Sequence, residues 1–221
     1  FQSEKIDFTP GIAITHFSDV STRLNYKSNF FNNLFFYPGM DLGYRVNQNL
    51  KLYSNIGYTY RIPTYTDLFY SSPTTLGNEN LKLEKALTKE FGLKYLKNNF
   101  NLSMSLYQRD ASDIIDYVKN NETEPWQANN IREIITKGFE LNMGYKFYLG
   151  AFRLQNINIG YSNIDDELLE TNFAFSRYAL NSLKNQITAT YMFEVNEKIS
   201  STFSYKNAER ADKEKYTVVD F

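Results

Sequence analysis

Two segments with strictly alternating apolar and polar residues, joined by a long polar stretch, constrain the fold of this chain more than any other feature. Residues 50–60 place Leu52 and Ile56 on one face, and residues 87–95 repeat the pattern. Side chains of a β-strand point alternately to the two faces of a sheet, so this period of two predicts strands. Because residues 62–84 between them are predicted to be a loop, the unit is a hairpin with a large connection.

The same unit recurs along the chain, and its connections alternate in length. Further strands are predicted at 11–17, 23–30, 40–46, 100–107, 136–148, 152–161, 186–194 and 199–205. Short turns are predicted at 18–20, 47–49, 97–99, 149–150 and 195–197, and long loops at 31–38, 62–84, 110–131, 163–183 and 207–215. In an up-and-down sheet every second connection lies at the same end. One end is therefore expected to carry tight turns and the other end large loops.

This sorting of short and long connections is typical of outer-membrane β-barrels. Several predicted strands exceed the roughly 9–11 residues that a tilted strand needs to cross the hydrocarbon. One strand face is apolar and the other carries Lys, Glu, Asn, Thr, Ser and Gly, as expected for lipid outside and a wet lumen inside. We expect an all-β, antiparallel up-and-down transmembrane β-barrel. About 10–11 strands are readable, so residues 1–221 are expected to be one part of a barrel domain.

The amino-acid composition limits the classes of protein and of binding site that this chain can represent. Aromatic residues make up 17% of the chain, with 18 Tyr and 18 Phe, which favours many positions at a boundary between apolar and polar surroundings. The formal net charge is −1, so the chain lacks a basic field for nucleic acid. Cysteine is absent, which excludes disulfides and thiolate sites. A soluble β-sandwich remains the structural alternative, although its strands are usually shorter and its loops are not sorted by length.

Several motifs resemble the TonB-dependent receptors. The stretch RIPTYTDL at 61–68 matches an R-x-P-T-x-x-[ED]-L stretch of that family. The stretch GNENLKLE at 77–84 is similar to G-N-x-x-L-x-P-E, with Leu83 in place of the proline. EFG at 90–92 matches the E-x-G of the next strand, and GFEL at 138–141 is similar to a later strand start. Residues 37–41 and 176–184 are similar to the vitamin B12 (BtuB-like) branch.

The resemblance implies a barrel of about 22 strands, plugged by an N-terminal domain, in the cell outer membrane. Such a receptor binds a scarce ligand such as cobalamin or a siderophore and imports it with energy relayed by TonB. The chain begins at Phe1 without an initiator Met or a signal peptide, so we expect an internal piece of a longer chain. The plug, which would contact TonB, and the last strands are expected outside it. A surface lipoprotein is a further expected partner, and a passive porin is the alternative function.

The candidate ligand-binding residues lie in two of the predicted loops, 62–84 and 110–131. They are aromatic or amide side chains: Tyr65, Phe69, Tyr70, Trp126 and Asn130. Aromatic rings on a barrel rim can stack on a flat ligand such as a corrin or a siderophore. The alternative roles are packing within the loops, an aromatic girdle and, for Trp126, an interface anchor.

No catalytic site, metal site or cofactor is predicted, and we expect a protein that is not an enzyme. His16 is the only histidine, and no Gly-x-Ser-x-Gly elbow accompanies it. No phosphate loop or H-E-x-x-H motif occurs. Asp165, Asp166 and Glu167 carry oxygen ligands suited to Ca²⁺, but a solvated acidic loop is the favoured interpretation.

Overall fold

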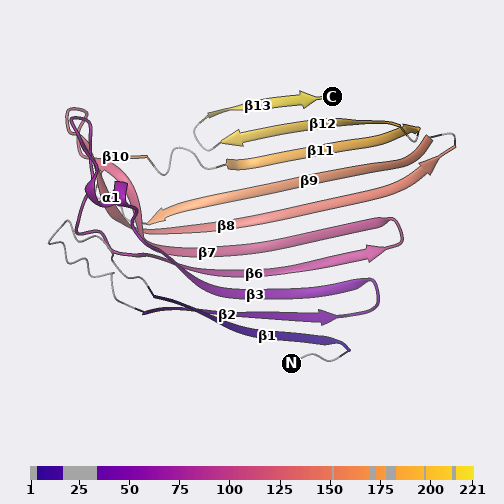
Figure 1. Cartoon of the computed structure of the whole chain (residues 1–221), viewed down its shortest axis with the longest axis horizontal. Helices are drawn as coiled ribbons and strands as arrows, with labels where there is room; N and C mark the ends of the chain where they lie inside the picture. Colours follow the sequence, from indigo (N-terminus) through magenta and orange to yellow (C-terminus); the bar gives the residue numbers. More distant parts are fainter. Residues whose placement is uncertain are drawn as a thin grey trace.

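Ten long strands of the computed structural model form one antiparallel sheet, in which each strand pairs with the next one along the chain (Figure 1). The structure describes residues 4–16, 34–150, 152–169, 173–177, 183–196, 198–210 and 213–221. The strands are β1 (Ile6–His16), β2 (Leu34–Arg45), β3 (Leu50–Arg61), β6 (Glu84–Lys97), β7 (Phe100–Lys119), β8 (Trp126–Leu149), β9 (Phe152–Leu169), β11 (Leu183–Asn196), β12 (Ile199–Arg210) and β13 (Lys213–Asp220). The predicted up-and-down order is confirmed.

Small elements gather at the end of the sheet that carries the long connections, which we call the loop end. They are helix α1 (Tyr65–Phe69) and the two-residue strands β4 (Ser71–Ser72), β5 (Thr75–Leu76) and β10 (Phe175–Ser176). In Figure 1, α1 and β10 lie at the left, whereas the tight turns lie at the right. Among the described residues, no helix is long and apolar enough to cross a membrane.

The register of the strands brings apolar side chains into continuous rows on one face, which we call the outward face. One row crosses eight strands: Ile6, Tyr44, Leu52, Leu93, Met104, Leu141, Tyr161 and Ile187. Many outward side chains are exposed, including Leu106 at 58% and Phe91 at 54%. An apolar band of this extent needs a lipid cover, since soluble monomers rarely expose such a surface.

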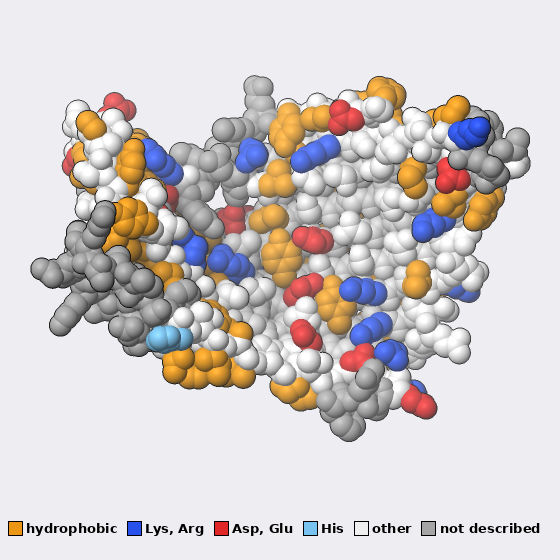
Figure 2. Space-filling model, viewed as in Figure 1, with side chains coloured by type: hydrophobic (Ala, Val, Ile, Leu, Met, Phe, Trp, Pro, Cys, Tyr) orange, Lys and Arg blue, Asp and Glu red, His pale blue; other side chains and the backbone are white. Residues whose placement is uncertain are grey.

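The next row along the strands lies on the opposite face, which we call the lumen face, and it is mostly polar or small. Its members are Asp7, Gly43, Tyr53, Gly92, Ser105, Glu140, Ser162 and Gln186. The sheet face shown in Figure 2 is mainly polar, with acidic and basic side chains interspersed. A shift of one residue in any pairing would exchange the two faces, so the apolar band also holds the register.

Outward aromatic side chains cluster near the tight turns. Tyr145 stacks on Phe147 with ring centres 5.7 Å apart, and Tyr191 stacks on Phe193 at 5.4 Å. These rings shield Gln155, which is 1% exposed and accepts a hydrogen bond from the Tyr191 hydroxyl. Such a belt is typical of the membrane–water interface, where amphipathic rings are favoured.

The tight turns at 47–49 and 97–99 use asparagine in two different ways. The Asn47 side chain accepts hydrogen bonds from the backbone N–H groups of Asn49 and Leu50, at 2.8 and 2.9 Å. Asn98 has a positive φ of 51°, which asparagine tolerates better than most residues. These turns keep consecutive strands in direct pairing.

The prediction for the N-terminal part is wrong in two respects. β1 begins at Ile6 rather than Gly11, because Pro10 lies within the ladder, opposite Met40, and does not interrupt the pairing with β2. Residues 34–38 belong to β2 and pair with β1, so 31–38 is not a loop throughout. The predicted turn 18–20 and strand 23–30 lie outside the described residues.

The predicted loop 110–131, in which the sequence indicates an extended piece only at 114–118, is mostly strand, and this is the largest correction. β7 and β8 have 20 and 24 residues and stay paired up to Val118 and Gln127, leaving only 120–125 as connection. The period of two is lost where Asp113 takes a positive φ of 54°, and consecutive apolar residues follow it. Both faces of this upper hairpin are packed, so its sequence does not alternate.

Two other predicted long loops are shorter than expected. β9 continues to Leu169 along β8, so most of the acidic stretch starting at 163 is strand. β12 ends at Arg210 and β13 begins at Lys213, so the predicted loop 207–215 is also largely strand. Polar strand residues beyond the apolar band resemble loop residues in composition, which explains both errors.

The buried apolar side chains of the described chain lie almost entirely at the loop end. One cluster contains Ala86, Ala111, Ile114, Val118, Ile131 and Ile134. A second cluster joins Leu68 of α1 and Leu81 to Ile115 and Ala128 of the hairpin. Elsewhere the sheet is one layer thick. The loop end is therefore the part of the chain that packs like a globular protein.

Gly92 provides a test of the lumen face. A Cβ atom at this position would lie 2.5 Å from the Tyr53 ring and 2.6 Å from the Met104 carbonyl oxygen. We expect Gly92→Ala to destabilise the barrel by about 1–3 kcal/mol through overpacking. The measurement is the temperature at which the full-length gene product loses its folded mobility on SDS gels.

Gly57→Ala is the matched control, because no atom lies within 4 Å of a Cβ at Gly57. Both glycines lie within strands on the lumen face. An equal effect of the two substitutions would show that glycine content, and not the close approach of Tyr53, decides stability at Gly92.

Candidate ligand-binding site

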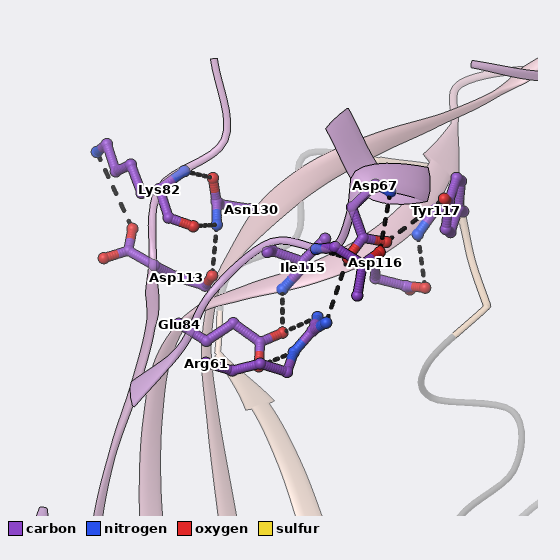
Figure 3. Close-up of polar contacts among 10 residues, drawn as sticks. Arg61, Asp67, Lys82, Glu84, Asp113, Ile115, Asp116, Tyr117 and Asn130 are labelled. Carbon is purple, nitrogen blue, oxygen red and sulfur yellow. Dashed lines mark hydrogen bonds and ion pairs between the residues drawn. The ribbon is translucent and has the colours of Figure 1, made fainter. Parts of the chain in front are cut away.

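Arg61 holds the base of the long loop between β3 and β6 (Figure 3). Its Nε and Nη2 atoms donate to the two carboxylate oxygens of Glu84, both at 2.6 Å. Its Nη1 donates to Asp67 at 3.2 Å. Such two-point pairing fixes the guanidinium plane as well as its distance. Arg61 therefore ties the last residue of β3 to the first residue of β6 and to helix α1.

Asp67 fixes the short helix by a capping box. The Thr64 side chain accepts from the Asp67 N–H, and the Asp67 carboxylate accepts from the Thr64 N–H at 2.9 Å. This satisfies two of the donors that a helix start leaves without partners. Because the same carboxylate also binds Arg61, the position of α1 depends on the pair formed with β3.

The hairpin of β7 and β8 closes the other side of this network. The Ile115 N–H donates to Glu84 at 2.7 Å, and the Tyr117 hydroxyl donates to Asp67 at 3.4 Å. Burial, together with the charge of Asp67, raises the pKa of Tyr117 above its usual range. The pair with Glu84 raises the pKa of Arg61 further, so the guanidinium stays charged. The network thus contains the neutral phenol of Tyr117 and the charged guanidinium of Arg61, which both contact buried carboxylates.

Two tight contacts position the second half of the loop. Gly77 passes directly beneath α1, where a Cβ would lie 2.8 Å from the Leu68 carbonyl group, so only glycine fits. The Asn130 side chain accepts from the Lys82 N–H at 2.8 Å and donates to the carbonyl oxygens of Lys82 and Asp113. The loop is therefore held by backbone contacts along its length.

The predicted aromatic residues of this loop lie together at α1. Tyr65 is 72% exposed and Tyr70 is 48% exposed. Phe69 lies one helical turn from Tyr65, with ring centres 4.9 Å apart, and also packs on the second apolar cluster. The structure thus brings Tyr65 and Phe69 together on a fixed helix, and Tyr70 lies at the C-cap of that helix.

Trp126 and Asn130 lie on β8, and they differ in what they can offer a ligand. Trp126 is partly buried, and the side chains of Lys119 and Arg177 both lie over its ring. Asn130 uses its amide to hold residue 82, so its contacts are those of a structural clamp. A ligand role of the five predicted residues stays a prediction.

The residues that sequence reasoning missed are the network residues Arg61, Asp67, Glu84 and Tyr117. A signal for them was present, because Arg61, Asp67 and Glu84 are the charged positions of the motifs at 61–68 and 77–84. Their charges pair with each other, so the motif builds the loop base rather than contacting solvent. The helix could have been found from Thr64 and Asp67, which have capping-box spacing.

The arrangement can present side chains rigidly at the loop end, and it lacks the features of a metal site. Within the described ranges, no three His, Cys, Asp or Glu residues lie together as metal ligands. Asp165, Asp166 and Glu167 lie on β9, where successive side chains point to opposite faces. His16 ends β1 opposite Leu34.

The network can be tested with Arg61→Met in the full-length gene product. The substitution leaves Asp67 and Glu84, which are only 8% and 9% exposed, without their cation. We expect the free energy of local unfolding of this region to fall by about 1–3 kcal/mol. The lower end of this range is expected because Arg61 itself is partly exposed. The readout is faster amide hydrogen exchange in α1 and in residues 62–83.

Lys89→Gln is the control for this experiment. Lys89 pairs with Asp110 at 2.9 Å, but the pair is more exposed, so its loss should change exchange little. Unchanged protection of α1 in Arg61→Met would show that the apolar contact of Leu68, and not the ion pair, holds the helix.

Comparison with known proteins agrees with this geometry. The family model "TonB dependent receptor-like, beta-barrel" matches residues 1–221. The vitamin B12 transporter BtuB of Photobacterium profundum is 28% identical over 105 residues, which are 46% of this chain and 17% of that protein. BtuB of Vibrio vulnificus is 26% identical over 102 residues, covering 46% of this chain and 16% of that protein.

Solved structures show the same fold at low sequence identity. The siderophore receptor PirA from Pseudomonas aeruginosa has a TM-score of 0.65 and 16% identity, covering 98% of this chain and 36% of that one. The copper transporter OprC has a TM-score of 0.71 and 15% identity, covering 99% of this chain and 36% of that one. The matching family is one of receptors, in agreement with the expectation of a non-enzymatic protein. The chain belongs to the TonB-dependent receptor-like β-barrel family, whose members are outer-membrane proteins.

Proposed function

We propose that the protein containing this chain is an active-transport receptor of the outer membrane. It binds a scarce small ligand at the loop end and imports it with energy relayed by TonB. The observation that carries this proposal is the family match over residues 1–221. The rigid loop base around Arg61 supports it, because a binding surface on fixed elements loses less entropy on ligand binding.

Vitamin B12 is the ligand we propose first, and a siderophore is the second candidate. The matches to two BtuB transporters support a corrinoid, although each covers less than half of this chain. PirA, a siderophore receptor, and OprC, a copper transporter, share the fold alone. The exposed rings of Tyr65 and Tyr70 provide flat apolar surfaces that suit a corrin or an aromatic siderophore.

Further strands and a plug complete the proposed receptor. Within the described residues, β1 and β13 each pair with one strand, so both have open edges. Open edges are not tolerated in hydrocarbon, where every backbone group needs a partner. We propose that residues 1–221 form part of a larger barrel domain in contact with outer-membrane lipid. TonB would act through an N-terminal plug, and a surface lipoprotein could cover the loop end.

Uptake tests the proposed function directly. Cells that lack their own B12 receptor and express the full-length gene should take up radiolabelled cyanocobalamin in a saturable way. Because the energy is relayed by TonB, a protonophore or deletion of TonB should abolish uptake while leaving surface binding intact. The measurement is cell-associated radioactivity with and without each treatment.

The alternative function, a passive porin, makes the opposite prediction. Uptake through a porin would not saturate and would not respond to the protonophore, and the purified protein would conduct ions in planar bilayers. Saturable uptake of a ferric siderophore instead of cobalamin would support the receptor function and show that the ligand is a siderophore.

The role of the aromatic candidate residues in ligand binding can be tested by truncating their side chains. We expect Tyr65→Ala and Trp126→Ala each to weaken binding of the imported ligand by about tenfold, as aromatic contacts in binding sites commonly do. Calorimetry on the detergent-purified receptor measures the effect. Tyr148→Ala is the matched control, because Tyr148 is equally exposed, at 73%, but lies beside a tight turn at the opposite end. Equal affinities of all three variants would remove these side chains from the ligand site.

A further inference from the structure

Two basic side chains share one indole ring at the outer part of the loop end. The Lys119 ammonium lies 4.9 Å from the centre of the Trp126 ring, and the Arg177 guanidinium lies 4.5 Å from it. Lys119 also lies 5.3 Å from the Phe175 ring, and Arg177 lies 5.5 Å from the Tyr117 ring. Cations prefer the faces of aromatic rings, so these contacts hold both charges in place.

The backbone fixes the two cations as well as the rings do. β10 pairs with β7, with Phe175 opposite Lys119. The Arg177 N–H donates to the Tyr117 carbonyl oxygen at 3.3 Å. β5 pairs with the start of β8 at Trp126. Three segments distant in sequence thus meet at Trp126, and two of them, the hairpin of β7 and β8 and the segment of β10, contribute side chains to the cluster.

Neither cation forms an ion pair with a carboxylate of the described residues. The Lys119 ammonium donates to the backbone carbonyl of Glu122 at 3.2 Å. The neighbouring carboxylate of Glu124 accepts from the Asn120 N–H and the Asn121 side chain, at 3.0 and 2.7 Å. Asp116 accepts from the Ser176 hydroxyl. The acidic groups near the cluster are therefore used elsewhere.

Two positive charges within 5 Å of one ring centre are at most about 10 Å apart, which is close to the Debye length at physiological salt. Salt therefore screens their repulsion only in part, and an anion bound to both cations would lower it further. Arginine suits this role because its planar donors match carboxylate and phosphate oxygens. Within the described residues, the cluster therefore has the charge and the donors of an anion site and no carboxylate that pairs with either cation.

We propose that Lys119 and Arg177, held over Trp126, bind a carboxylate or phosphate group of the imported ligand. This inference rests on the proposed function and adds that the ligand reaches the receptor through an anionic group. It also changes the role of Trp126, whose ring orients the two cations instead of stacking on the ligand. A lipid headgroup is not the source of the anion. Leu106 is the last exposed large apolar residue of β7, and Lys119 lies roughly 40 Å farther along that strand.

Binding of citrate and of pyrophosphate to the full-length, detergent-purified receptor tests the proposal. Calorimetry gives the affinity, and Trp126 fluorescence reports the site, with Trp126→Phe identifying its part of the signal. We expect saturable binding of at least one probe that weakens as salt rises. The double variant K119Q/R177Q should bind that probe at least tenfold more weakly, whereas K119R/R177K should keep most of the affinity.

Lys82→Gln is the matched control, because Lys82 is also at the loop end and its side chain is 75% exposed. It should leave anion binding unchanged. A wild-type receptor that binds neither probe at millimolar concentration overturns the proposal. So does a double variant that binds like the wild type, or a Lys82→Gln variant that loses as much affinity as the double variant.

The outcome for the anion site is separable from the outcome for transport. Anion binding that depends on Lys119 and Arg177, without energy-dependent uptake of any ligand, would overturn the transport function and leave the site standing. Energy-dependent uptake of cyanocobalamin, which carries no net charge, with no loss in K119Q/R177Q would overturn the anion site as a ligand contact and leave transport standing.

Discussion

Pairing of every backbone polar group in hydrocarbon is the constraint on which this structure depends. It requires continuous ladders, and the ladders from β1 to β13 fix which side chains lie opposite each other. The row from Ile6 to Ile187 is apolar at each of the eight strands from β1 to β11 that it crosses, because their registers bring these side chains opposite one another. With the backbone satisfied within the sheet, side chains on the two faces are free to suit lipid on one side and water on the other.

Beyond the apolar band the chain changes its means of stabilisation. The upper hairpin of β7 and β8, with α1 beside it, has buried apolar clusters, as a globular domain does, and an ion pair in which the carboxylate of Glu84 is buried. Arg61 is central here because it contacts carboxylates from two other segments at the point where the loop leaves the sheet. The loop end is therefore an ordered platform, and this order is what allows specific side chains to face a ligand in fixed positions.

Sequence patterns predicted the fold class and most tight turns, and they failed where the period of two ended. Strands β3 and β6 were found because their faces differ in polarity. Alternation does not predict the upper parts of β7 and β8 as strands, because Ile114 and Ile115 are both buried, on opposite sides of the hairpin. Alternation of apolar and polar residues indicates a strand that is buried on one face. A hairpin that is packed on both faces does not show this alternation.

The sequence by itself determined the sheet, its two faces and the end at which the long connections gather, because alternation and turn residues are local properties. It also contained the motif residues Arg61, Asp67 and Glu84, without indicating what they contact. Only the tertiary structure decided that these residues pair with one another. It also placed Arg177 beside Lys119 on Trp126, since contacts between segments some fifty residues apart depend on the registers of all the strands between them.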